Sequence, residues 1–422
     1  MDMENGLPLT EEQRAEVERQ LAVIRRGAAE IVPEDDLRRK VERSVATGVP
    51  LKVKLGLDPS APDIHLGHTV VLQKLRQFQE LGHRVQLIIG DFTGRIGDPT
   101  GKSETRKQLS DEDVRRNSET YREQFAKILD AEKTEIYYNS HWLGELRFAD
   151  VVQLASKMTV ARMLEREDFA KRFAGGQPIS IHEFFYPLMQ GYDSVALGSD
   201  IELGGTDQKF NLLMGRMLQK EYGQEPQAAI MTPLLEGLDG VQKMSKSLGN
   251  YIGINEEPKE MYGKAMSIPD ELMLKYFELA TDVPMEEIDA LRAGLADGSA
   301  HPRDAKMRLA RTLVRMYHGE AAAEEAERHF VTVFQKRALP DDIAEYGVPE
   351  NLVENGAVRI VRLLVESGLQ PSGAEARRTV LGGGVRLNER KIGDPNAVVT
   401  VRDGDILQVG KRKFLRLRLP QR

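Results

Sequence analysis

The fold is decided by residues 51–89, which have the sequence LKVKLGLDPSAPDIHLGHTVVLQKLRQFQELGHRVQLII. Residues 51–57 alternate apolar and polar side chains, a period that predicts a strand. Residues 66–81 carry apolar side chains at helical spacing and stop at Gly82, as an amphipathic helix does. Residues 85–89 are continuously apolar, as in a buried parallel strand. These segments predict a right-handed βαβ unit, the building block of a Rossmann-type parallel sheet.

The segments that follow this unit extend the same α/β pattern. A glycine-rich loop, residues 90–102, comes after the second strand, at the edge where open α/β sheets bind ligands. Ser110 and Asp113 form a candidate capping box for a long helical stretch. We therefore predict a main α/β domain over residues 1–250 with a helical insertion at about 110–170. Its later strands are predicted at 136–138, 201–203 and 229–235, with a helix at 210–218.

Two smaller domains are predicted after the main one. Residues 251–339 show helical periodicity and few strand signals, which indicates an α-helical domain. Residues 340–353 contain Pro340 and Pro349 and form the predicted linker. Residues 354–422 combine two predicted helices with short alternating segments, which indicates a small α+β domain.

Composition and charge fit a folded multidomain protein with a basic terminal module. The 422 residues are 41% hydrophobic and include no cysteine, which excludes disulfides, thiol nucleophiles and cysteine–zinc sites. The formal net charge is -7, but residues 354–422 carry +7 and residues 1–353 carry -14. A tail charged for solubility is the alternative, and the folded pattern of this segment counts against it.

No membrane partner is expected from the sequence. No apolar run reaches the roughly 18 residues that a membrane span requires. The N-terminus, Met1-Asp2-Met3-Glu4, is acidic and lacks an apolar signal region. We therefore expect a cytoplasmic protein.

Two histidines stand three residues apart at the start of the predicted helix, in His65-Leu66-Gly67-His68. A zinc ion would need further ligands that the neighbouring sequence does not supply, so we predict no metal site. Gly67 would let a nucleotide approach the helix N-terminus closely, and Ser60 adds a donor on the same side. The alternative is a surface pair of histidines beside a tight turn.

Far downstream, Lys243-Met244-Ser245-Lys246-Ser247 lies between glycine-containing turns, which predicts a mobile loop. Lysines on such a loop can close on a triphosphate in the transition state. A solvated basic turn is the alternative interpretation.

The segment Gly97–Ser103 invites interpretation as a phosphate-binding P-loop. That pattern requires a glycine at position 96, where this chain has Ile96, and Asp98 would point a carboxylate at the phosphates. We reject the P-loop and assign Asp98 to a substrate ammonium group.

Tyr186, Gln190 and Asp193 lie four and three residues apart, on one face of a predicted helix. Three aligned polar groups in an otherwise apolar stretch indicate a lined pocket, with ordinary packing as the alternative. The next motif, Gly204-Gly205-Thr206-Asp207-Gln208, joins a strand to a helix. Its glycines permit close backbone approach, and the Asp207 carboxylate is suited to accept ribose hydroxyl protons.

The histidine and lysine motifs resemble the HIGH and KMSKS signatures of class I aminoacyl-tRNA synthetases. More closely, the chain resembles the bacterial tyrosyl-tRNA synthetases over nearly its full length. This resemblance implies activation of L-tyrosine by Mg²⁺-ATP and transfer to the 3′ end of tRNA(Tyr), without a tightly bound cofactor. The matching segments are Gly56–Ser60 with His65–His68, Gly97–Pro99, Tyr186 with Gln190 and Asp193, Gly204–Gln208, and Lys243–Ser247.

The resemblance also implies roles for single residues. The tyrosine-binding set is Asp98, Tyr186 and Gln190 for the ammonium group, Asp193 for the phenol, and Gln208, with Asn139 orienting Tyr186. The ATP-binding set is Asp58, Ser60, Gly67, Gly205 and Asp207, with His65, His68, Lys102, Lys243 and Lys246 on the phosphates. Many relatives have a tyrosine where Lys54 stands, as a second partner of the phenol, so this contact differs here. An unpaired buried carboxylate would reject phenylalanine, as tyrosyl-tRNA synthetases are known to do.

The C-terminal segment resembles an S4-type RNA-binding module. Arginines on a small folded surface suit the phosphates of structured RNA, and the resemblance implies contact with the long variable arm of the tRNA. It also implies that residues 251–339 bind the anticodon and that a homodimer forms through the insertion near residues 110–170. The candidate RNA-binding residues are Arg377, Arg378, Arg386, Lys411 and Arg412.

Two other functions remain open at this point. Tryptophanyl-tRNA synthetases share both signatures, although the Tyr186 cluster and the terminal module favour tyrosine. A non-catalytic RNA-binding protein with a retained synthetase body is the second alternative. This second alternative is disfavoured because the histidines and lysines of both motifs are intact: His65, His68, Lys243 and Lys246.

Overall fold

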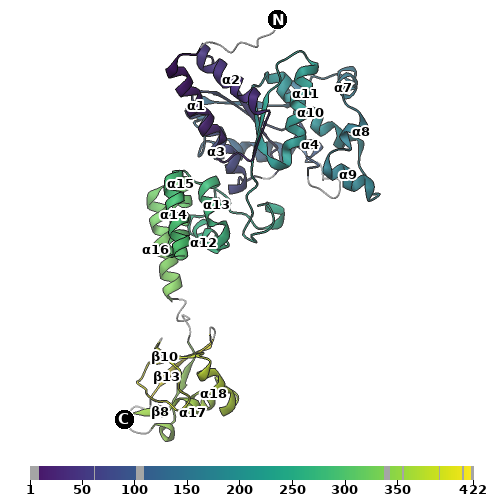
Figure 1. The fold of residues 1–422 in the computed structure, drawn as a ribbon. Coiled ribbons are helices and arrows are strands. Elements are labelled where there is room, and N and C mark those ends of the chain that lie inside the picture. The colour runs from purple at the N-terminus through teal and green to yellow at the C-terminus, as the bar shows by residue number, and fades with distance from the viewer. Residues whose placement is uncertain are drawn as a thin grey trace. The chain divides into compact units, whose positions relative to one another are not determined.

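The computed structural model describes residues 9–60, 62–100, 109–336, 343–353, 356–388, 390–410 and 413–419. The chain forms two compact units, which divide at Arg328 (Figure 1). Three of the predicted site residues lie outside the described residues: Lys102, Lys411 and Arg412. Within the described ranges, no helix is long and apolar enough to cross a membrane.

A six-stranded sheet forms the centre of the first unit, in the order β1-β6-β5-β2-β3-β4. The edge strand β1 is antiparallel to β6, and the other neighbours are parallel, so the predicted Rossmann-type sheet is confirmed. β1 was not predicted, and β6 ends at Thr232, earlier than predicted. The strands are β1 Glu30–Val32, β2 Lys52–Leu57, β3 Arg84–Ile89, β4 Thr134–Tyr138, β5 Ile201–Gly205 and β6 Ala228–Thr232.

Helices cover both faces of this sheet (Figure 1). On one face lie α1 Glu11–Arg25, α2 Glu34–Thr47 and α3 Leu66–Glu80, and on the other α10 Ile181–Leu197 and α11 Lys209–Glu221. The predicted apolar stripe of α3 faces the core, where Leu72, Leu75 and Phe78 are fully buried. Burial of apolar area at about 25 cal/mol per Å² holds α3 in place and thereby fixes the histidines at its N-terminus.

Six α-helices of 4 to 15 residues lie between β3 and α10 in the described part of the chain. Ser110 Oγ accepts a hydrogen bond from the Asp113 amide at 3.2 Å and so caps α5, as predicted. The Ser180 amide donates to Glu183 Oε2 at 2.8 Å, which fixes the start of α10. These helices are α4 Thr93–Ile96, α5 Asp111–Phe125, α6 Ser140–Leu143, α7 Phe148–Ala155, α8 Val160–Met163 and α9 Glu167–Ala174.

Five α-helices lie in residues 258–336, within the segment 251–339 whose periodicity predicted helices. Leu309, Leu313 and Tyr317 of α15 are buried in this helical region. The first compact unit includes both the sheet and most of these helices, so the domain boundary at residue 250 stays a prediction. The helices are α12 Pro258–Ser267, α13 Met273–Ala280, α14 Met285–Asp297, α15 Pro302–His318 and α16 Glu320–Lys336.

The second unit contains a small α+β fold with its own core, in which Leu363, Leu407 and Leu417 are fully buried. Its main sheet has the order β10-β9-β12-β13-β7, and β11 pairs with β8. The elements are β7 Glu345–Gly347, β8 Ala357–Arg359, α17 Ile360–Glu366, α18 Gly373–Leu381, β9 Val385–Leu387, β10 Arg390–Ile392, β11 Val398–Thr400, β12 Ile406–Val409 and β13 Lys413–Arg418.

The segment predicted as a linker, residues 340–353, contains structure of its own. Residues 345–347 form β7, which pairs in parallel with residues 416–418 of β13 at the edge of the sheet. The Val348 amide extends this pairing by donating to the Arg418 carbonyl at 2.8 Å. The described part of the predicted linker therefore belongs to the terminal fold, because its backbone groups complete a sheet edge.

Candidate active site

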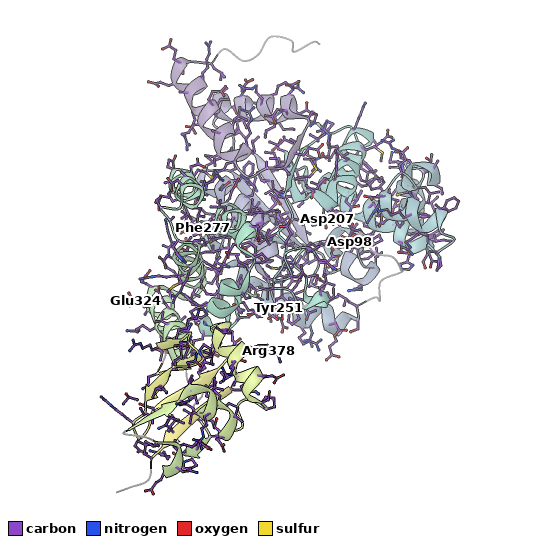
Figure 2. The ribbon with its side chains drawn as sticks, turned by 60° about the horizontal axis from the view of Figure 1, so that its bottom comes forward. Asp98, Asp207, Tyr251, Phe277, Glu324 and Arg378 are labelled. Atoms are coloured by element: carbon purple, nitrogen blue, oxygen red, sulfur yellow. The ribbon has the colours of Figure 1, made fainter. Side chains whose placement is uncertain are left out.

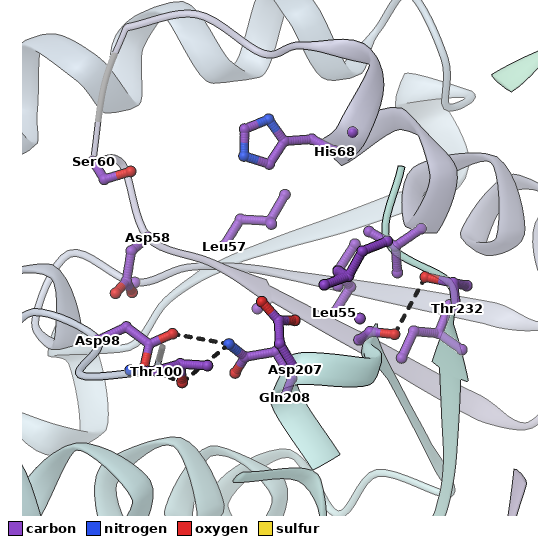
Figure 3. Close-up of a pocket in the computed structure, with 18 of the residues that line it drawn as sticks. Leu55, Leu57, Asp58, Ser60, His68, Asp98, Thr100, Asp207, Gln208 and Thr232 are labelled. Carbon is purple, nitrogen blue, oxygen red and sulfur yellow. Dashed lines mark hydrogen bonds between the residues drawn. The ribbon is translucent and has the colours of Figure 1, made fainter. Parts of the chain in front are cut away.

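A cavity of about 510 Å³ opens at the carboxyl ends of β2, β3, β5 and β6 (Figure 3). It brings together the histidine pair, the lysine loop and the polar face of α10. The predicted residues that line it are Asp58, Ser60, His65, Gly67, His68, Asp98, Asn139, Tyr186, Gln190, Asp193, Gly205, Asp207, Gln208, Lys243 and Lys246.

The two histidines form one stacked unit at the N-terminus of α3. Their ring centroids are 3.8 Å apart, and the His65 amide donates to His68 Nδ1 at 3.3 Å. A neutral ring that accepts at Nδ1 carries its proton on Nε2, which makes that atom a hydrogen-bond donor. Burial, assisted by the charges of Lys246 and Lys243, lowers the pKa of His68 to about 4. Both rings are therefore neutral donors near pH 7, since burial lowers the pKa of His65 further.

The lysine loop contacts the histidine motif directly. Met244 Sδ accepts a hydrogen bond from the Gly67 amide at 3.3 Å. The ammonium group of Lys243 lies 2.7 Å from Asp207 Oδ2, and Lys246 donates to the carbonyl of Asp63. Both lysines therefore reach the cavity in this structure, where protein oxygens are their partners.

Asp193 lines the cavity and is 3% exposed. Trp142 Nε1 donates to its Oδ1 at 2.8 Å, and Asn139 Nδ2 donates to its Oδ2 at 3.3 Å. Burial raises the pKa of this carboxyl group to about 7, against the opposing effects of Lys54, Trp142 and Asn139. Two donors therefore hold the Asp193 carboxylate in one orientation, and its pKa lies near neutral pH.

The predicted role of Asn139 as an orienter of Tyr186 does not match these contacts. Asn139 follows β4, and its amide reaches Asp193 and the Thr93 hydroxyl, the latter at 3.0 Å. The Tyr186 hydroxyl instead donates to Asp58 Oδ2 at 2.9 Å. Tyr186 is thus oriented by a carboxylate at the end of β2.

Asp58 can reach this position because residue 90 is a glycine. A Cβ atom on Gly90 would lie 2.1 Å from Asp58 Oδ1 and 2.4 Å from the Thr93 hydroxyl, a clash that no relaxed structure tolerates. The Thr93 hydroxyl donates to the same Asp58 oxygen at 2.7 Å. Gly90 therefore makes the Asp58–Tyr186 contact possible.

Asp98 and Asp207 lie in the same region of the molecule but have different partners (Figure 2). Gln208 Nε2 donates to Asp98 Oδ2 at 2.9 Å, and the Thr100 hydroxyl donates to Asp98 Oδ1 at 2.6 Å (Figure 3). Arg166, 5% exposed, places Nη2 3.6 Å from Asp98 Oδ1. Asp98 is thus held between an amide, a hydroxyl and a guanidinium.

Sequence reasoning missed four site residues: Thr93, Thr100, Trp142 and Arg166. Each contacts a predicted site residue that is distant in the chain or lies on a loop without regular spacing. No local sequence pattern therefore identifies these four residues. Composition offered one signal that could have identified Trp142. It is the single tryptophan, and an indole N–H requires a hydrogen-bond acceptor when it is buried.

Two further observations concern metals and RNA. Across the described ranges, no group of three or more acidic or histidine side chains could hold a metal ion. In the second unit, Arg377 and Arg378 are exposed on α18, and Arg386 is exposed on β9. Three of the five predicted RNA-binding residues therefore have solvent-exposed side chains.

Comparisons with known proteins agree with this site. Residues 47–335 match the model of the family described as tRNA synthetases class I (W and Y), and residues 342–416 match the tyrosine–tRNA ligase SYY-like C-terminal domain. The tyrosine–tRNA ligase of Moorella thermoacetica is 67% identical over 402 residues, covering 95% of this chain and 96% of the relative. That of Carboxydothermus hydrogenoformans is 63% identical, covering 95% and 98%.

Solved structures show the same fold at lower identity. A C-terminally truncated mitochondrial tyrosyl-tRNA synthetase from Coccidioides posadasii has a TM-score of 0.62 and 23% identity, covering 76% of this chain and 96% of that chain. The tyrosyl-tRNA synthetase from Archaeoglobus fulgidus, complexed with L-tyrosine, has a TM-score of 0.60 and 24% identity, covering 74% and 99%. The family model spans residues 47–335 and both relatives match 95% of the chain, so this chain belongs to the class I tRNA synthetase family of the tryptophan and tyrosine enzymes.

Proposed function

We infer that this chain is a tyrosine–tRNA ligase that acts in two steps. A carboxylate oxygen of L-tyrosine attacks the α-phosphorus of ATP, the bond to pyrophosphate breaks, and tyrosyl-adenylate forms. A hydroxyl of the 3′-terminal adenosine of tRNA(Tyr) then attacks the tyrosyl carbonyl, and AMP leaves. The observation that carries this proposal is the cavity that joins the histidine pair, the lysine loop and the Tyr186–Asp193 face.

In this proposal Asp193 receives the phenol of the substrate. An ionised carboxylate is an acceptor only, so it pairs with the phenolic O–H and loses this third donor when phenylalanine binds. Trp142 and Asn139 support the proposal because their two donors fix the carboxylate plane.

The substrate ammonium group is assigned to Asp98, Tyr186 and Gln190, with Gln208 in a supporting role. Gln208 holds Asp98 by a 2.9 Å hydrogen bond, and Asp58 holds Tyr186 by one of 2.9 Å. Side chains restrained in this way bind an ammonium group with little loss of rotamer entropy. The assignment places the ammonium group of tyrosine between α10 and the segment after α4.

ATP is assigned to the outer part of the cavity. Ribose would contact Asp207 and Gly205, adenine would lie near Gly67, and Asp58 and Ser60 would lie beside the nucleotide. Neutral His65 and His68 would donate to the phosphates, together with Lys102, Lys243 and Lys246. These donors would meet negative charge that develops on the phosphoryl group and departing pyrophosphate. Mg²⁺ is proposed to arrive on the ATP phosphates as part of the substrate.

Binding of the tRNA is assigned to the helical region and the terminal unit. Arg377, Arg378 and Arg386 would bind phosphates of the variable arm, with Lys411 and Arg412, and residues 251–339 would contact the anticodon. Exposed arginines on a folded surface and the +7 charge of residues 354–422 support this assignment. The same proposal places the chain in the cytoplasm, where bacterial tRNA is charged.

We also propose a homodimer that forms through the helical insertion and the start of α10. Several large apolar side chains in residues 148–181 are exposed, which is costly in water unless another surface covers them. Phe148 is 84% exposed, Phe173 is 67% and Ile181 is 76%. Light scattering on Phe148→Glu/Phe173→Glu should give a monomer mass where the unchanged chain gives twice that mass.

The decisive test of the function is amino-acid-dependent exchange of pyrophosphate into ATP. Tyrosine should support exchange, and tryptophan or phenylalanine at equal concentration should not. Exchange with tryptophan alone would assign the chain to the other branch of its family. Absence of exchange with every amino acid, in a protein that still binds tRNA, would favour the non-catalytic alternative.

A further inference from the structure

Buried polar groups lie behind the tyrosine end of the cavity, and an ion pair between Lys54 and Glu202 is at their centre. The two residues are register partners on the adjacent parallel strands β2 and β5. Lys54 Nζ lies 3.1 Å from Glu202 Oε1, and each side chain is 1% exposed. Neither residue is among the described residues that line the cavity. The pair therefore lies one layer away from the substrate.

Glu202 has its hydrogen-bonding capacity filled. Besides Lys54, it accepts from Gln190 Nε2 at 3.2 Å, from the Ser194 hydroxyl at 3.3 Å, and from Gln227 Nε2. Gly215 leaves room for this cluster, because a Cβ atom there would lie 2.5 Å from Gln227 Nε2. A carboxylate with four donors around it is held rigidly.

Gln190 is the member of this cluster that lines the cavity, and it is held at two points. Its Nε2 donates to Glu202, and its backbone carbonyl accepts from Lys54 Nζ at 3.3 Å. Because an ionised carboxylate accepts only, the side-chain amide must turn its NH₂ toward Glu202. The carbonyl oxygen of the amide is then the atom left for a donor in the cavity.

We propose that the Lys54–Glu202 pair is a positioning element of the amino-acid site, which fixes Gln190 with its carbonyl oxygen toward the substrate ammonium group. This rests on the proposed function, which assigns Gln190 to that group. Lys54 acts through Glu202 and Gln190 and makes no contact with the substrate. The rival role for Lys54 is direct pairing with the phenol near Asp193, whose charge it already influences.

The test replaces the pair by neutral side chains of similar shape, in Lys54→Met/Glu202→Gln. The double change keeps the net charge of the buried layer, so Asp193 loses one positive and one negative neighbour together. An amide at position 202 can donate as well as accept, so it no longer dictates the orientation of Gln190. Binding is compared for three compounds in the exchange assay: the KM of tyrosine, and the inhibition constants of L-phenylalanine and of 3-(4-hydroxyphenyl)propanoate.

The two analogues separate the two ends of the site, because phenylalanine lacks the phenol and the propanoate lacks the ammonium group. We expect the tyrosine and phenylalanine constants to rise together, by about tenfold for one weakened charged hydrogen bond. The constant of the propanoate should change less than about twofold. Weaker binding of the propanoate with phenylalanine unchanged would make Lys54 a phenol partner and overturn the proposal. Equal weakening of all three compounds, or none, would also overturn it.

A control away from the cavity is the double variant Lys40→Met/Glu225→Gln. Lys40 is 1% exposed and lies 3.1 Å from Glu225, which is 53% exposed, and neither lines the cavity. This variant should leave all three constants unchanged. If Lys54→Met/Glu202→Gln does not fold, Lys54→Arg is tested with the same compounds. This variant keeps the charge but displaces Glu202. Its constants should follow the same pattern with smaller fold-changes.

Failure of this inference and failure of the proposed function give different results. If the function is wrong, the unchanged chain shows no tyrosine-dependent exchange. If only the inference is wrong, exchange is normal and the three constants follow one of the contradicting patterns.

Discussion

The indole Nε1 of Trp142 lies 2.8 Å from Oδ1 of Asp193, so the protein's one tryptophan directs its only side-chain donor to the carboxylate assigned to the substrate phenol. The contact joins α6, which follows β4, to the middle of α10. It restricts rotation of the carboxylate, and it also stabilises the ionised form. Under the proposed function, the selectivity of this site would therefore depend on a residue that need not touch the substrate.

Trp142→Phe removes the donor while keeping an aromatic ring. Removal of one hydrogen bond to a charged group costs about 1.5–3 kcal/mol, so the KM of tyrosine should rise by roughly ten- to a hundredfold. The KM of ATP, measured in the same exchange assay, should stay the same. An unchanged tyrosine KM would show that Asn139 alone is enough to orient Asp193.

Tyrosine activation should depend on pH through Asp193. Its pKa of about 7 means that the carboxyl group is largely protonated at pH 6 and ionised at pH 8. Because the phenol donates to the ionised form, kcat/KM for tyrosine should fall by about tenfold per pH unit below 7. The profile of Asp193→Asn should lack this limb, and a limb that persists in this variant would have another origin.

The same shift makes a stability prediction. The folded-state pKa lies above the usual value of 3.8, so the folded protein binds this proton more tightly than the unfolded chain. The ionised Asp193 carboxylate therefore destabilises the folded state relative to the unfolded chain. This destabilisation is absent below about pH 4 and complete above about pH 7. Urea unfolding should therefore find Asp193→Asn more stable, relative to the unchanged chain, at pH 8 than at pH 5. A difference that does not change between these pH values would contradict the prediction.

His68→Ala should slow adenylate formation by about a hundredfold or more, because the variant lacks a preorganised donor to the phosphates. The affinity for tyrosine should be unaffected, since its assigned contacts lie elsewhere in the cavity. Stopped-flow or quenched-flow measurement of adenylate formation separates the two quantities. His141→Ala, at an exposed histidine outside the cavity, is the control. Equal rates of adenylate formation in both variants would remove His68 from the groups that stabilise the transition state.

Arg377→Ala/Arg378→Ala should weaken tRNA binding at every salt concentration and reduce its salt dependence. Removing one arginine–phosphate interaction lowers the slope of log affinity against log salt by about 1. Filter binding between about 50 and 200 mM salt measures the slope. Arg402→Ala, a change at another exposed arginine of the same unit, is the control. A slope equal to that of the unchanged chain would remove α18 from the RNA surface.

The central fold was predictable because its elements are long and periodic. Residues 52–57, 66–80 and 84–89 form the strand, helix and strand that their apolar patterns indicated. β1 and β7 were missed for one physical reason. Each has three residues and sits at a sheet edge, so its backbone pairing, and no side-chain period, decides its structure.

The candidate site was predictable as a set of residues but not as a set of contacts. Tyr186, Gln190 and Asp193 line the cavity because helical spacing places them on one face of α10. The partners that hold them come from distant segments. Asp58 reaches Tyr186 from the end of β2, and Trp142 reaches Asp193 from α6. Such pairings arise only when the sheet brings strand ends together.

The 2.7 Å contact between Lys243 and Asp207 links the lysine loop to the segment that follows β5. An ionised carboxylate has lone pairs for several donors, so under the proposed function Asp207 would accept from Lys243 and from a ribose hydroxyl at the same time. A nucleotide bound there would therefore be joined, through one shared carboxylate, to the loop that carries its phosphate donors.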